Sequence, residues 1–487
     1  GIQGQAARTS GAIDVSAKRD QLDRGTREAA SVCGLILAAG KGTRMKSDKP
    51  KVVHEILGMP MLWFVHQTLA SLVSEERVLT VLGYQSDVVL SSLPHLDGHA
   101  VMQPEQLGTG HALQCALPDL DDLGCDWCLV VNGDAPLLNS EALGDLLQMC
   151  VDRDAPLACM SIELDDPSGY GRVIRSPAGE FLGIVEDKDL TIEQREAGLN
   201  EVNAGVYCLH AERTRPFLDQ LTNDNQQGEY YITQLMDLCV QAGKAVPVVC
   251  AGQDSSFLGV NSPKELVVCE EILRQRLVER VEDSGVIVRN PDQVRLGPLV
   301  EVGPGAELIG PLEVYGASSI GPGARIESHV WISDSEVETG ALVRSFSHLE
   351  GARVGQNCQV GPYARLRPGA LLRSGAKAGN FVEIKKAVLH EQCKVNHLTY
   401  IGDAEIGQGA NVGAGTITCN YDGKSKHKTT IGKGAFIGSN TALVAPVTVG
   451  DNALVGAGST ITRDVPDEML AVTRIKQKNL PWKSRSE

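Results

Sequence analysis

Residues 431–461 read IGKGAFIGSNTALVAPVTVGDNALVGAGSTI, with an aliphatic side chain at every sixth position. Those positions are Ile431, Ile437, Leu443, Val449, Val455 and Ile461. Neither an α-helix nor a hairpin predicts a period of six. A parallel β-helix does, because each of its short strands sends one aliphatic side chain inward, and stacked coils bury these side chains in columns. The stretch therefore predicts a β-helix with three strands in each coil.

The same period extends toward the N-terminus. It is regular from Val354 to Ile384 and weaker from Val302 to Ile326. Glycine often follows the inward position, as in Val360-Gly361, where it allows backbone angles that a side chain would forbid. We expect residues 286–465 to form about ten coils of a left-handed parallel β-helix of hexapeptide repeats, within a C-terminal domain at 286–487 that ends in a tail. The alternative is a set of ordinary β-sandwich strands.

Strand and helix patterns alternate before the β-helix. Cys33–Ala39 reads as a buried strand, residues 60–73 have helical spacing, and Arg77–Leu82 reads as the next strand. This alternation predicts a doubly wound, Rossmann-like α/β domain at 32–261, which binds its ligands at the carboxyl ends of the strands. A charged helical pattern at 262–285 predicts a linker helix.

Composition limits the classes of function. With 45 basic and 61 acidic residues the formal charge is −16, which argues against nucleic-acid binding, and no apolar run is long enough to span a membrane. Cys125 and Cys128 have metal-ligand spacing but no second pair, so a structural role is favoured. Scattered free thiols fit a reducing cytoplasm. We expect residues 1–31, which lack the apolar segment of a secretory signal, to be a disordered extension or an added remnant without function.

The loop at 37–45, LAAGKGTRM, follows the first strand and can bring its amides close to a triphosphate. It is not a Walker A loop, because Gly42 follows the lysine, and the G-x-G-x-x-G pattern fails at Met45. The loop resembles the L-x-x-G-x-G-T-R-[ML] signature of sugar-nucleotide pyrophosphorylases, and the downstream P-K of that family stands at Pro50-Lys51.

Two further segments resemble the same family. Residues 103–112, QPEQLGTGHA, are similar to its base-recognition segment, in which a glutamine side chain and loop amides read a uracil edge. Residues 131–136, VNGDAP, place Asp134 just after a buried strand, where a carboxylate can hold Mg²⁺. Alone, Asp134 could equally be a turn former or a helix cap.

A second polar constellation interrupts the regular hexapeptides. It consists of GPYARLRPG at 361–369, GNFVEIKK at 379–386, NHLTYIGD at 396–403 and GAGTITCNYDG at 413–423. A lone histidine such as His397 is more often structural than catalytic. Here it stands among basic, tyrosine and asparagine side chains on a scaffold that otherwise prefers small residues.

Both constellations together, over nearly the whole chain after residue 31, resemble the bifunctional N-acetylglucosamine-1-phosphate uridyltransferase / glucosamine-1-phosphate acetyltransferase family. The resemblance implies acetyl transfer from acetyl-CoA to glucosamine-1-phosphate, then uridylyl transfer from UTP to N-acetylglucosamine-1-phosphate with release of pyrophosphate. It also implies Mg²⁺ in the first domain and a cytoplasmic homotrimer, formed through the β-helix, that supplies precursors of peptidoglycan and lipopolysaccharide.

Site residues follow from the same resemblance. Catalysis is assigned to His397 as general base and to Lys51 and Arg44, while Asp134 and Asn261 are the metal ligands. Nucleotide and sugar binding in the first domain is assigned to Leu37, Ala38, Ala39, Gly40, Lys51, Gln103, Gly108, Thr109, Asn132, Gly133, Asp134, Gly171, Glu186, Asn203 and Asn261. Sugar-phosphate binding in the second is assigned to Arg367, Lys385, Tyr400 and Asn411. Acetyl-CoA binding is assigned to Ala414, Asn420, Tyr421, Ser439, Ala457 and Arg474, and Lys426 could also meet CoA phosphates.

Three residues depart from the family pattern: Asn132, where an aromatic residue is common, Ala204, where a hydroxyl residue is common, and Gln234, where aspartate is usual. Three other kinds of protein remain as alternatives. They are a nucleotidyltransferase with an inert β-helical arm, a zinc-dependent β-helix enzyme of the carbonic anhydrase type, and a non-catalytic scaffold of the translation-factor type. An inert arm would have no need of His397. A zinc enzyme would need three histidines that converge on the metal. A non-catalytic scaffold would be expected to lose the glycine-rich loop.

Overall fold

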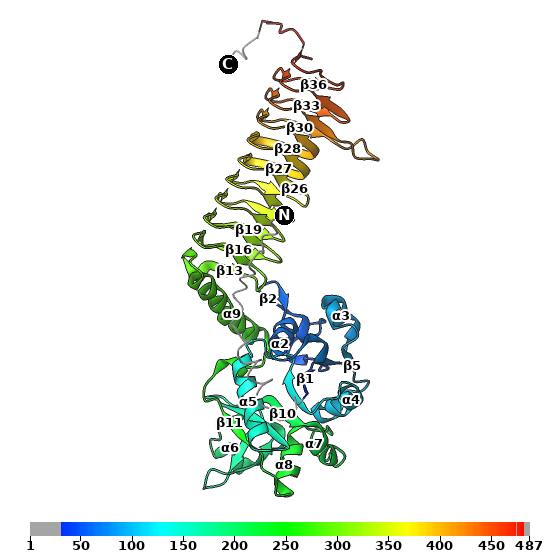
Figure 1. Ribbon diagram of the computed structural model, residues 1–487, viewed down its shortest axis with the longest axis vertical. Coiled ribbons are helices and arrows are strands. Elements are labelled where there is room, and N and C mark those ends of the chain that lie inside the picture. The colour runs from blue at the N-terminus through cyan, green and yellow to red at the C-terminus, as the bar shows by residue number, and fades with distance from the viewer. Residues whose placement is uncertain (1–30, 474, 482–487) are drawn as a thin grey trace, which may run out of the picture. The chain divides into compact units, whose positions relative to one another are not determined.

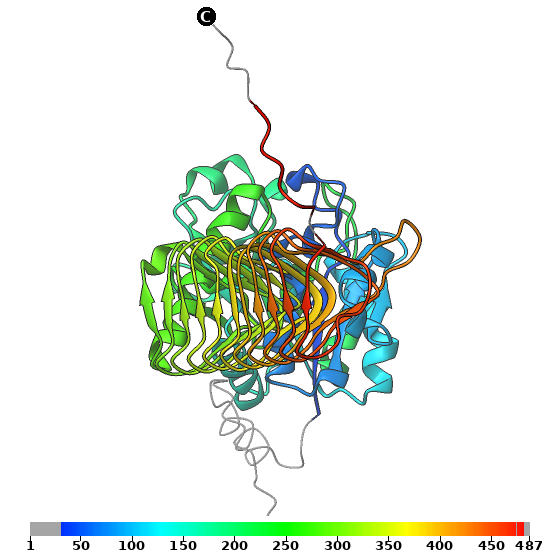
Figure 2. The same ribbon diagram turned by 90° about the horizontal axis from the view of Figure 1, so that it is seen from above.

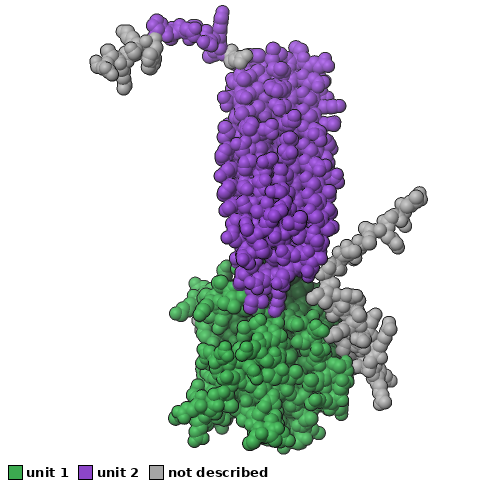
Figure 3. Space-filling view, turned by 90° about the vertical axis from the view of Figure 1, so that its left-hand side faces the viewer, with its two compact units in different colours: residues 1–270 green, residues 271–487 purple. Residues whose placement is uncertain are grey.

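The computed structural model describes residues 31–473 and 475–481, and the chain divides into two compact units, residues 1–270 and 271–487 (Figures 1 and 3). An α/β fold followed by a parallel β-helix confirms the expected fold class. The charged pattern predicted as a linker forms α9 (Pro263–Asp283), whose residues are divided between the two units. Apart from Ser31, the expected N-terminal extension lies outside the described residues.

The first unit contains a nine-stranded sheet with the order β11-β7-β10-β6-β1-β4-β5, and β8 and β9 lie off this path. β1 is parallel to β4 and β6, whereas β10 runs antiparallel to both β6 and β7. The sheet is therefore parallel around β1, and it is antiparallel where β10 pairs with β6, β7 and β8 and where β8 pairs with β9. The strands are β1 (Val32–Leu37), β4 (Val78–Leu82), β5 (Ala100–Met102), β6 (Trp127–Asn132), β7 (Leu157–Glu163), β8 (Arg172–Arg175), β9 (Phe181–Val185), β10 (Glu201–His210) and β11 (Val248–Cys250).

Helices cover both faces of this sheet. On β1, Ile36 packs in one apolar cluster with residues of α2 and α5, and Leu35 packs in a second cluster with residues of α4 and α8. Both side chains are fully buried, as expected for a strand that reads as a continuous apolar run. The helices are α2 (Met61–Ala70), α3 (Ser86–Ser92), α4 (Thr109–Asp122), α5 (Ser140–Asp152), α6 (Ile192–Glu196), α7 (Ala211–Leu218) and α8 (Thr233–Gln241).

In the described part of the second unit, 26 strands stack as a parallel β-helix from β12 (Ile287–Arg289) to β37 (Leu470–Ala471), and Figure 2 shows its coils from above. Most strands pair with the third strand further on, as expected for three strands in each coil. The strands that carry the second site are β25 (Arg365–Leu366), β27 (Lys377–Leu389), β28 (Lys394–Ile406), β29 (Asn411–Val412), β30 (Ile417–Cys419), β31 (Thr429–Ile431), β32 (Phe436–Ile437) and β35 (Leu454–Val455).

The residues of the six-residue period form the core of the β-helix. From Val354 to Ile384 and from Ile431 to Ile461 they are buried and belong to one continuous cluster. β27 turns two corners without a break in the strand, at Phe381 with φ +57° and at Lys386 with φ +45°. Asn380 before the first corner and Glu383 after it are half-buried, whereas Val382 between them is buried in the core, so polar side chains from two adjacent faces meet at the second site.

The cysteines are all free thiols, and Cys125 and Cys128 are buried in the first unit. Their burial fits the structural role expected from the lack of a second pair. Within the described part of the chain, no helix is long and apolar enough to cross a membrane.

Candidate active sites

The glycine-rich loop leaves β1 at the carboxyl edge of the parallel strands. Ala38 donates a backbone hydrogen bond to β4, and Gly133 N donates to Leu37 O at 2.9 Å, so the loop starts between the ends of β4 and β6. Gly42 has φ +60°, and a Cβ at this position would lie 2.6 Å from Lys51 Cβ. Glycine is therefore required for the loop to fold back against Lys51.

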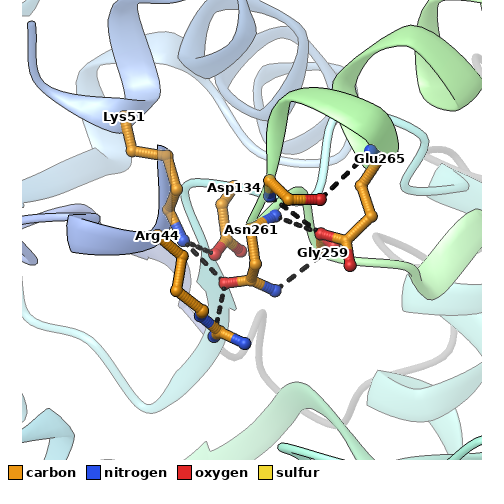
Figure 4. Close-up of polar contacts among 7 residues, drawn as sticks. Arg44, Lys51, Asp134, Gly259, Asn261 and Glu265 are labelled. Atoms are coloured by element: carbon orange, nitrogen blue, oxygen red, sulfur yellow. Dashed lines mark hydrogen bonds and ion pairs between the residues drawn. The ribbon is translucent and has the colours of Figure 1, made fainter. Parts of the chain in front are cut away.

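Four predicted residues that are far apart in the sequence meet beside this loop (Figure 4). Lys51 Nζ forms an ion pair with Asp134 Oδ2 and donates to Asn261 Oδ1 at 3.1 Å. Arg44 Nη2 donates to the same Asn261 oxygen at 3.0 Å. Two fixed cations and two oxygen ligands thus converge, and phosphoryl transfer depends mainly on such charge neutralisation and positioning.

The oxygens of Asp134 and Asn261 fit a hard divalent cation. They already converge on one positive group, the Lys51 ammonium, and carboxylate and amide oxygens are ligands suited to Mg²⁺. Among the described residues, no group of three or more His, Cys, Asp or Glu side chains could hold a metal. The remaining ligands would be water and phosphate oxygens, as is common for Mg²⁺.

Glu265 fixes Asn261 and was missed by the sequence analysis. Its Oε2 accepts from Asn261 N at 2.6 Å and from Ser262 N at 3.0 Å, while Glu265 N donates to Ser262 Oγ at 3.3 Å. This is a capping box at the start of α9, and the S-x-x-E spacing was readable in the sequence. The first turn of the helix therefore orients a predicted metal ligand.

The predicted base-recognition segment is held by the chain at 229–232. Gln103 is 3% exposed, and its Nε2 donates to Gly108 O at 3.0 Å and lies 3.0 Å from His111 Nδ1. Thr109 Oγ1 accepts from the backbone of this second segment at 3.0 Å. Gly108 has φ +105°, and a Cβ there would lie 2.5 Å from a backbone oxygen of the same segment. The predicted base-binding residues therefore lie on one loop whose conformation is fixed by its contacts with residues 229–232.

The three predicted sugar-binding residues also lie together. Asn203 N donates to Gly171 O at 2.8 Å, and a Cβ on Gly171 would lie 3.3 Å from Glu186 Oε2. Glu186 Oε1 accepts from Thr233 Oγ1 at 2.9 Å, and burial raises the pKa of the Glu186 carboxyl. Asn203 Nδ2 donates to Tyr207 Oη at 2.6 Å. Thr233 and Tyr207 are supporting contacts that the sequence did not reveal.

Two of the three departures from the family pattern, Asn132 and Gln234, have local structural roles. Asn132 Nδ2 lies 2.2 Å from where a Cβ of Gly205 would be, so Asn132 packs against the irregular part of β10 that carries Ala204. Gln234 Oε1 accepts from Thr222 N at 3.0 Å, and its Nε2 donates to Thr222 Oγ1 at 3.0 Å. The Gln234 amide therefore holds the loop at Thr222, because it both accepts a hydrogen bond from that residue and donates one to it.

Asp237 gives a testable pH dependence. Burial raises its pKa to about 6 from the ordinary 3.8, although Ile184 N donates to its Oδ1 at 3.3 Å. A raised carboxyl pKa means that stability is lost as pH rises from about 4 to about 6, because the unfolded chain releases the proton first. We expect Asp237→Asn to raise the melting temperature of the first unit at pH 7 and to have no effect at pH 4. Equal shifts at both pH values, measured against the exposed control Asp224→Asn, would contradict this assignment.

The second site begins with His397 on β28. Pairing of β27 with β28 sets Asn380 beside it, and His397 Nδ1 lies 2.8 Å from Asn380 Oδ1. A carboxamide oxygen only accepts hydrogen bonds, so this contact places the proton on Nδ1 and leaves the Nε2 lone pair available. Asn380 thereby selects the tautomer that a general base requires, a role the sequence analysis did not assign.

Three of the four predicted sugar-phosphate ligands, Arg367, Lys385 and Tyr400, lie on the face of the β-helix that begins after the corner following His397. Glu383 pairs in register with Tyr400 and, on its other side, with Arg365 of β25, and Arg367 forms an ion pair with Glu383 at 2.9 Å. The pKa of Lys385 is lowered, chiefly by the neighbouring Lys426 and also by Arg367. Lys426, which the sequence analysis considered for the CoA phosphates, is thus also a neighbour of the predicted sugar-phosphate ligand Lys385.

The predicted acetyl-CoA residues extend from His397 along the β-helix. The paired residues Val395, Val412, Ile437 and Val455 place His397, Ala414, Ser439 and Ala457 at the same position of successive coils. Neighbouring strands are about 4.8 Å apart, so the three small residues form a column about 10 Å long. An extended arm of a substrate fits such a column, with its reactive end at the histidine.

The remaining predicted residues lie around this column. Asn411 lies on β29, in register with Lys394 of β28 and Phe436 of β32. Asn420 is buried, and Tyr421 is exposed at the base of a projecting loop. Arg474 lies outside the described residues.

The fold and the two sites define a class: a nucleotidyltransferase domain joined to a hexapeptide-repeat acyltransferase. The model of the MobA-like NTP transferase domain matches residues 34–236, and the bacterial transferase hexapeptide model matches residues 428–463. The chain is 52% identical to the bifunctional protein GlmU of Nitratidesulfovibrio vulgaris strain DP4 over 94% of its own length and 100% of that protein. It is 44% identical to the bifunctional protein GlmU of Sorangium cellulosum over 91% of its length and 94% of that protein.

The chain belongs to the family of bifunctional GlmU proteins. It is accordingly an enzyme with a uridyltransferase domain and an acetyltransferase domain of hexapeptide repeats, which together act in UDP-N-acetylglucosamine synthesis. The expected enzyme class is confirmed, and the alternatives of an inert arm, a zinc enzyme and a non-catalytic scaffold are set aside.

Proposed function

We propose that the two sites act in sequence through the residues described above. The β-helix acetylates glucosamine-1-phosphate, and the first unit then transfers a uridylyl group from UTP to the N-acetylglucosamine-1-phosphate produced. The observation that carries this proposal is the presence of two separate constellations, Lys51 with Asp134 and His397 with Asn380, in different units.

In acetyl transfer, the substrate amine attacks the thioester carbon of acetyl-CoA. His397 Nε2 takes the proton as the nitrogen–carbon bond forms, the carbon–sulfur bond breaks, and protonated His397 returns the proton to the sulfur, so that CoA leaves as a thiol. Arg367, Lys385 and Lys426 bind the sugar phosphate, while Tyr400 and Asn411 position the sugar. The column beyond His397 binds acetyl-CoA, and Asn420, Tyr421 and Arg474 complete that subsite.

In uridylyl transfer, a phosphate oxygen of N-acetylglucosamine-1-phosphate attacks the α-phosphorus of UTP, and pyrophosphate leaves. Arg44 and Lys51 neutralise phosphate charge throughout. Mg²⁺ held by Asp134 and Asn261 would neutralise further charge on the phosphates. The uracil is bound by the loop of Gln103, Gly108 and Thr109 with the amides at 37–40, and the sugar is bound by Gly171, Glu186 and Asn203 beside Asn132 and Gly133.

We further propose a homotrimer built through the β-helix and domain bounds of 32–261, 262–285 and 286–487. The thirteen free thiols support a reducing cytoplasm as the location. The small-molecule partners are UTP, acetyl-CoA and the two sugar phosphates, and the chain's negative charge argues against nucleic acid.

Product analysis tests this function. Purified protein is incubated with Mg²⁺, glucosamine-1-phosphate, acetyl-CoA and UTP, and we expect free CoA, pyrophosphate and UDP-N-acetylglucosamine to appear together. With UTP omitted, CoA release should continue. CoA release that requires UTP would contradict the proposed order.

A further inference from the structure

A hairpin at residues 420–428 interrupts the β-helix between β30 and β31, where an orange loop projects in Figure 1. The coil that contains this hairpin is longer than the coil that follows it, as the residues paired between neighbouring coils show. Ala404 of β28 pairs with Thr429 of β31, whereas Thr430 of β31 pairs with Thr448 in the next coil. The extra residues carry Lys426, so the structure of this hairpin decides where that ammonium lies.

One carboxylate, that of Asp422, ties the hairpin together. Its Oδ1 accepts from Lys424 N at 2.8 Å and from Ser425 N at 2.7 Å, and its Oδ2 lies 2.7 Å from His427 Nε2. The backbone hydrogen bonds lower the pKa of Asp422, with His427 contributing. We name the Asp422–His427 contact the clasp. It joins residues on both sides of the turn, so it restricts the hairpin more than either backbone contact does.

The base of the hairpin is fixed to the preceding coil. Asn420 Nδ2 donates to Asp403 Oδ2 at 2.5 Å, and His427 N donates to Asn420 O at 2.8 Å. Tyr421 and Lys426 form an antiparallel bridge one position further out. Lys426 is therefore a partner in this bridge and directly precedes His427 of the clasp, so its backbone is held by both contacts.

The charges around Lys426 make this positioning costly. Lys385 pairs in register with Gly402, the neighbour of Asp403, and Asn420 of the hairpin donates to that Asp403 carboxylate, so the base of the hairpin lies beside Lys385. Lys426, a partner in the bridge at that base, is the chief cause of the lowered pKa of Lys385, and Arg367 adds a third positive charge. Glu383 pairs with Arg367, and the charge of Asp403 partly offsets the effect on Lys385. Two ammonium groups at short range repel each other, so an untied hairpin would swing Lys426 away into solvent. A bound dianion would remove this repulsion.

We propose that Asp422 and His427 are positioning residues for acetyl transfer, and that their clasp holds Lys426 next to Lys385 as a preformed subsite for the phosphate of the amino-sugar substrate. The inference rests on the proposed function of the second site. Preorganisation of this kind acts on the binding of the phosphate, because the loop no longer has to be ordered when the substrate arrives. The reacting amine and the thioester are left to His397.

His427→Ala tests the clasp. We expect the Kd and KM of glucosamine-1-phosphate to rise about ten-fold, with kcat and the KM of acetyl-CoA changed less than about two-fold, because only phosphate binding is affected. His427→Gln keeps an N–H donor of similar reach and should recover most of the loss. Asp422→Ala removes both the clasp and the turn contacts and should have an effect at least as large as that of His427→Ala.

His390→Ala is the matched control. His390 Nε2 lies 2.9 Å from Glu405 Oε1, and both histidines are 33% exposed, but His390 is outside the hairpin. We expect this control to leave all constants unchanged. An unchanged Kd in His427→Ala, or a fall in kcat alone, would overturn the clasp. If the unaltered protein binds glucosamine-1-phosphate without releasing CoA, the proposed acetyl transfer is wrong. The Kd values of the variants still test whether the clasp positions Lys426 for phosphate binding.

Discussion

His397→Ala is expected to lower acetyl transfer about a thousand-fold and to leave uridylyl transfer within about two-fold of the unaltered protein. A positioned general base contributes roughly 10² to 10⁴ in rate. The Asn380 contact leaves His397 Nε2 as the free lone pair in the neutral ring, so alanine removes the base and leaves the amine to lose its proton to water. The two rates are measured separately, as CoA release and as pyrophosphate release from supplied N-acetylglucosamine-1-phosphate.

His390→Ala again serves as the control, since it removes a histidine of the same β-helix that pairs with Glu405 instead. It should retain both activities. The KM of acetyl-CoA should also stay close to normal in His397→Ala, because the column beyond the histidine is untouched. Retained acetyl transfer in a folded His397→Ala protein would remove His397 from the mechanism.

Lys51→Ala is expected to lower uridylyl transfer about a thousand-fold while acetyl transfer stays unchanged. The ammonium bonds both Asp134 and Asn261, so its loss removes a fixed positive charge and leaves these two oxygens without that partner. Losing one preorganised group that stabilises transition-state charge costs about 10²- to 10³-fold, and disordering the metal ligands adds to this. Pyrophosphate release at saturating Mg²⁺ measures the effect.

Asp134→Asn provides the companion test of the metal. We expect a loss of similar size that higher Mg²⁺ concentrations partly recover, whereas the Lys51→Ala loss should not respond to Mg²⁺. Lys244→Ala, an exposed lysine after α8, is the control and should have no effect. A Lys51→Ala protein with normal uridylyl transfer would show that the cluster in Figure 4 is not the site of chemistry.

Much of the architecture could be predicted because the positions of apolar residues in the sequence indicate it directly. A six-residue period has one physical cause, and the residues it selected, such as Ile384 and Ile437, are fully buried. The strand at β1 was equally clear, since Leu35 and Ile36 read as a continuous apolar run between two helical layers. The antiparallel placement of β10 was not predicted, because apolar patterns do not carry strand direction.

The parts of the sites that could not be predicted depend on contacts across the fold. No local pattern shows that Asn380 orients His397, because their pairing follows from the register of β27 and β28. Lys426 lies on an insertion, so the hexapeptide period no longer locates it. Glu265 is different, since its contacts with Ser262 and Asn261 are local and its capping box was readable. The contacts of Asn261 with Lys51 and Arg44 join distant parts of the chain and required the fold.

The most direct measurement of the central claim, that one chain carries two independent sites, combines the two inactive variants. His397→Ala and Lys51→Ala proteins are purified separately and mixed with glucosamine-1-phosphate, acetyl-CoA, UTP and Mg²⁺. Neither protein alone should form UDP-N-acetylglucosamine, and the mixture should form it, because acetylated sugar phosphate released by one protein is uridylylated by the other. A mixture that forms no UDP-N-acetylglucosamine would mean that at least one of the substitutions disables both reactions, which contradicts two independent sites.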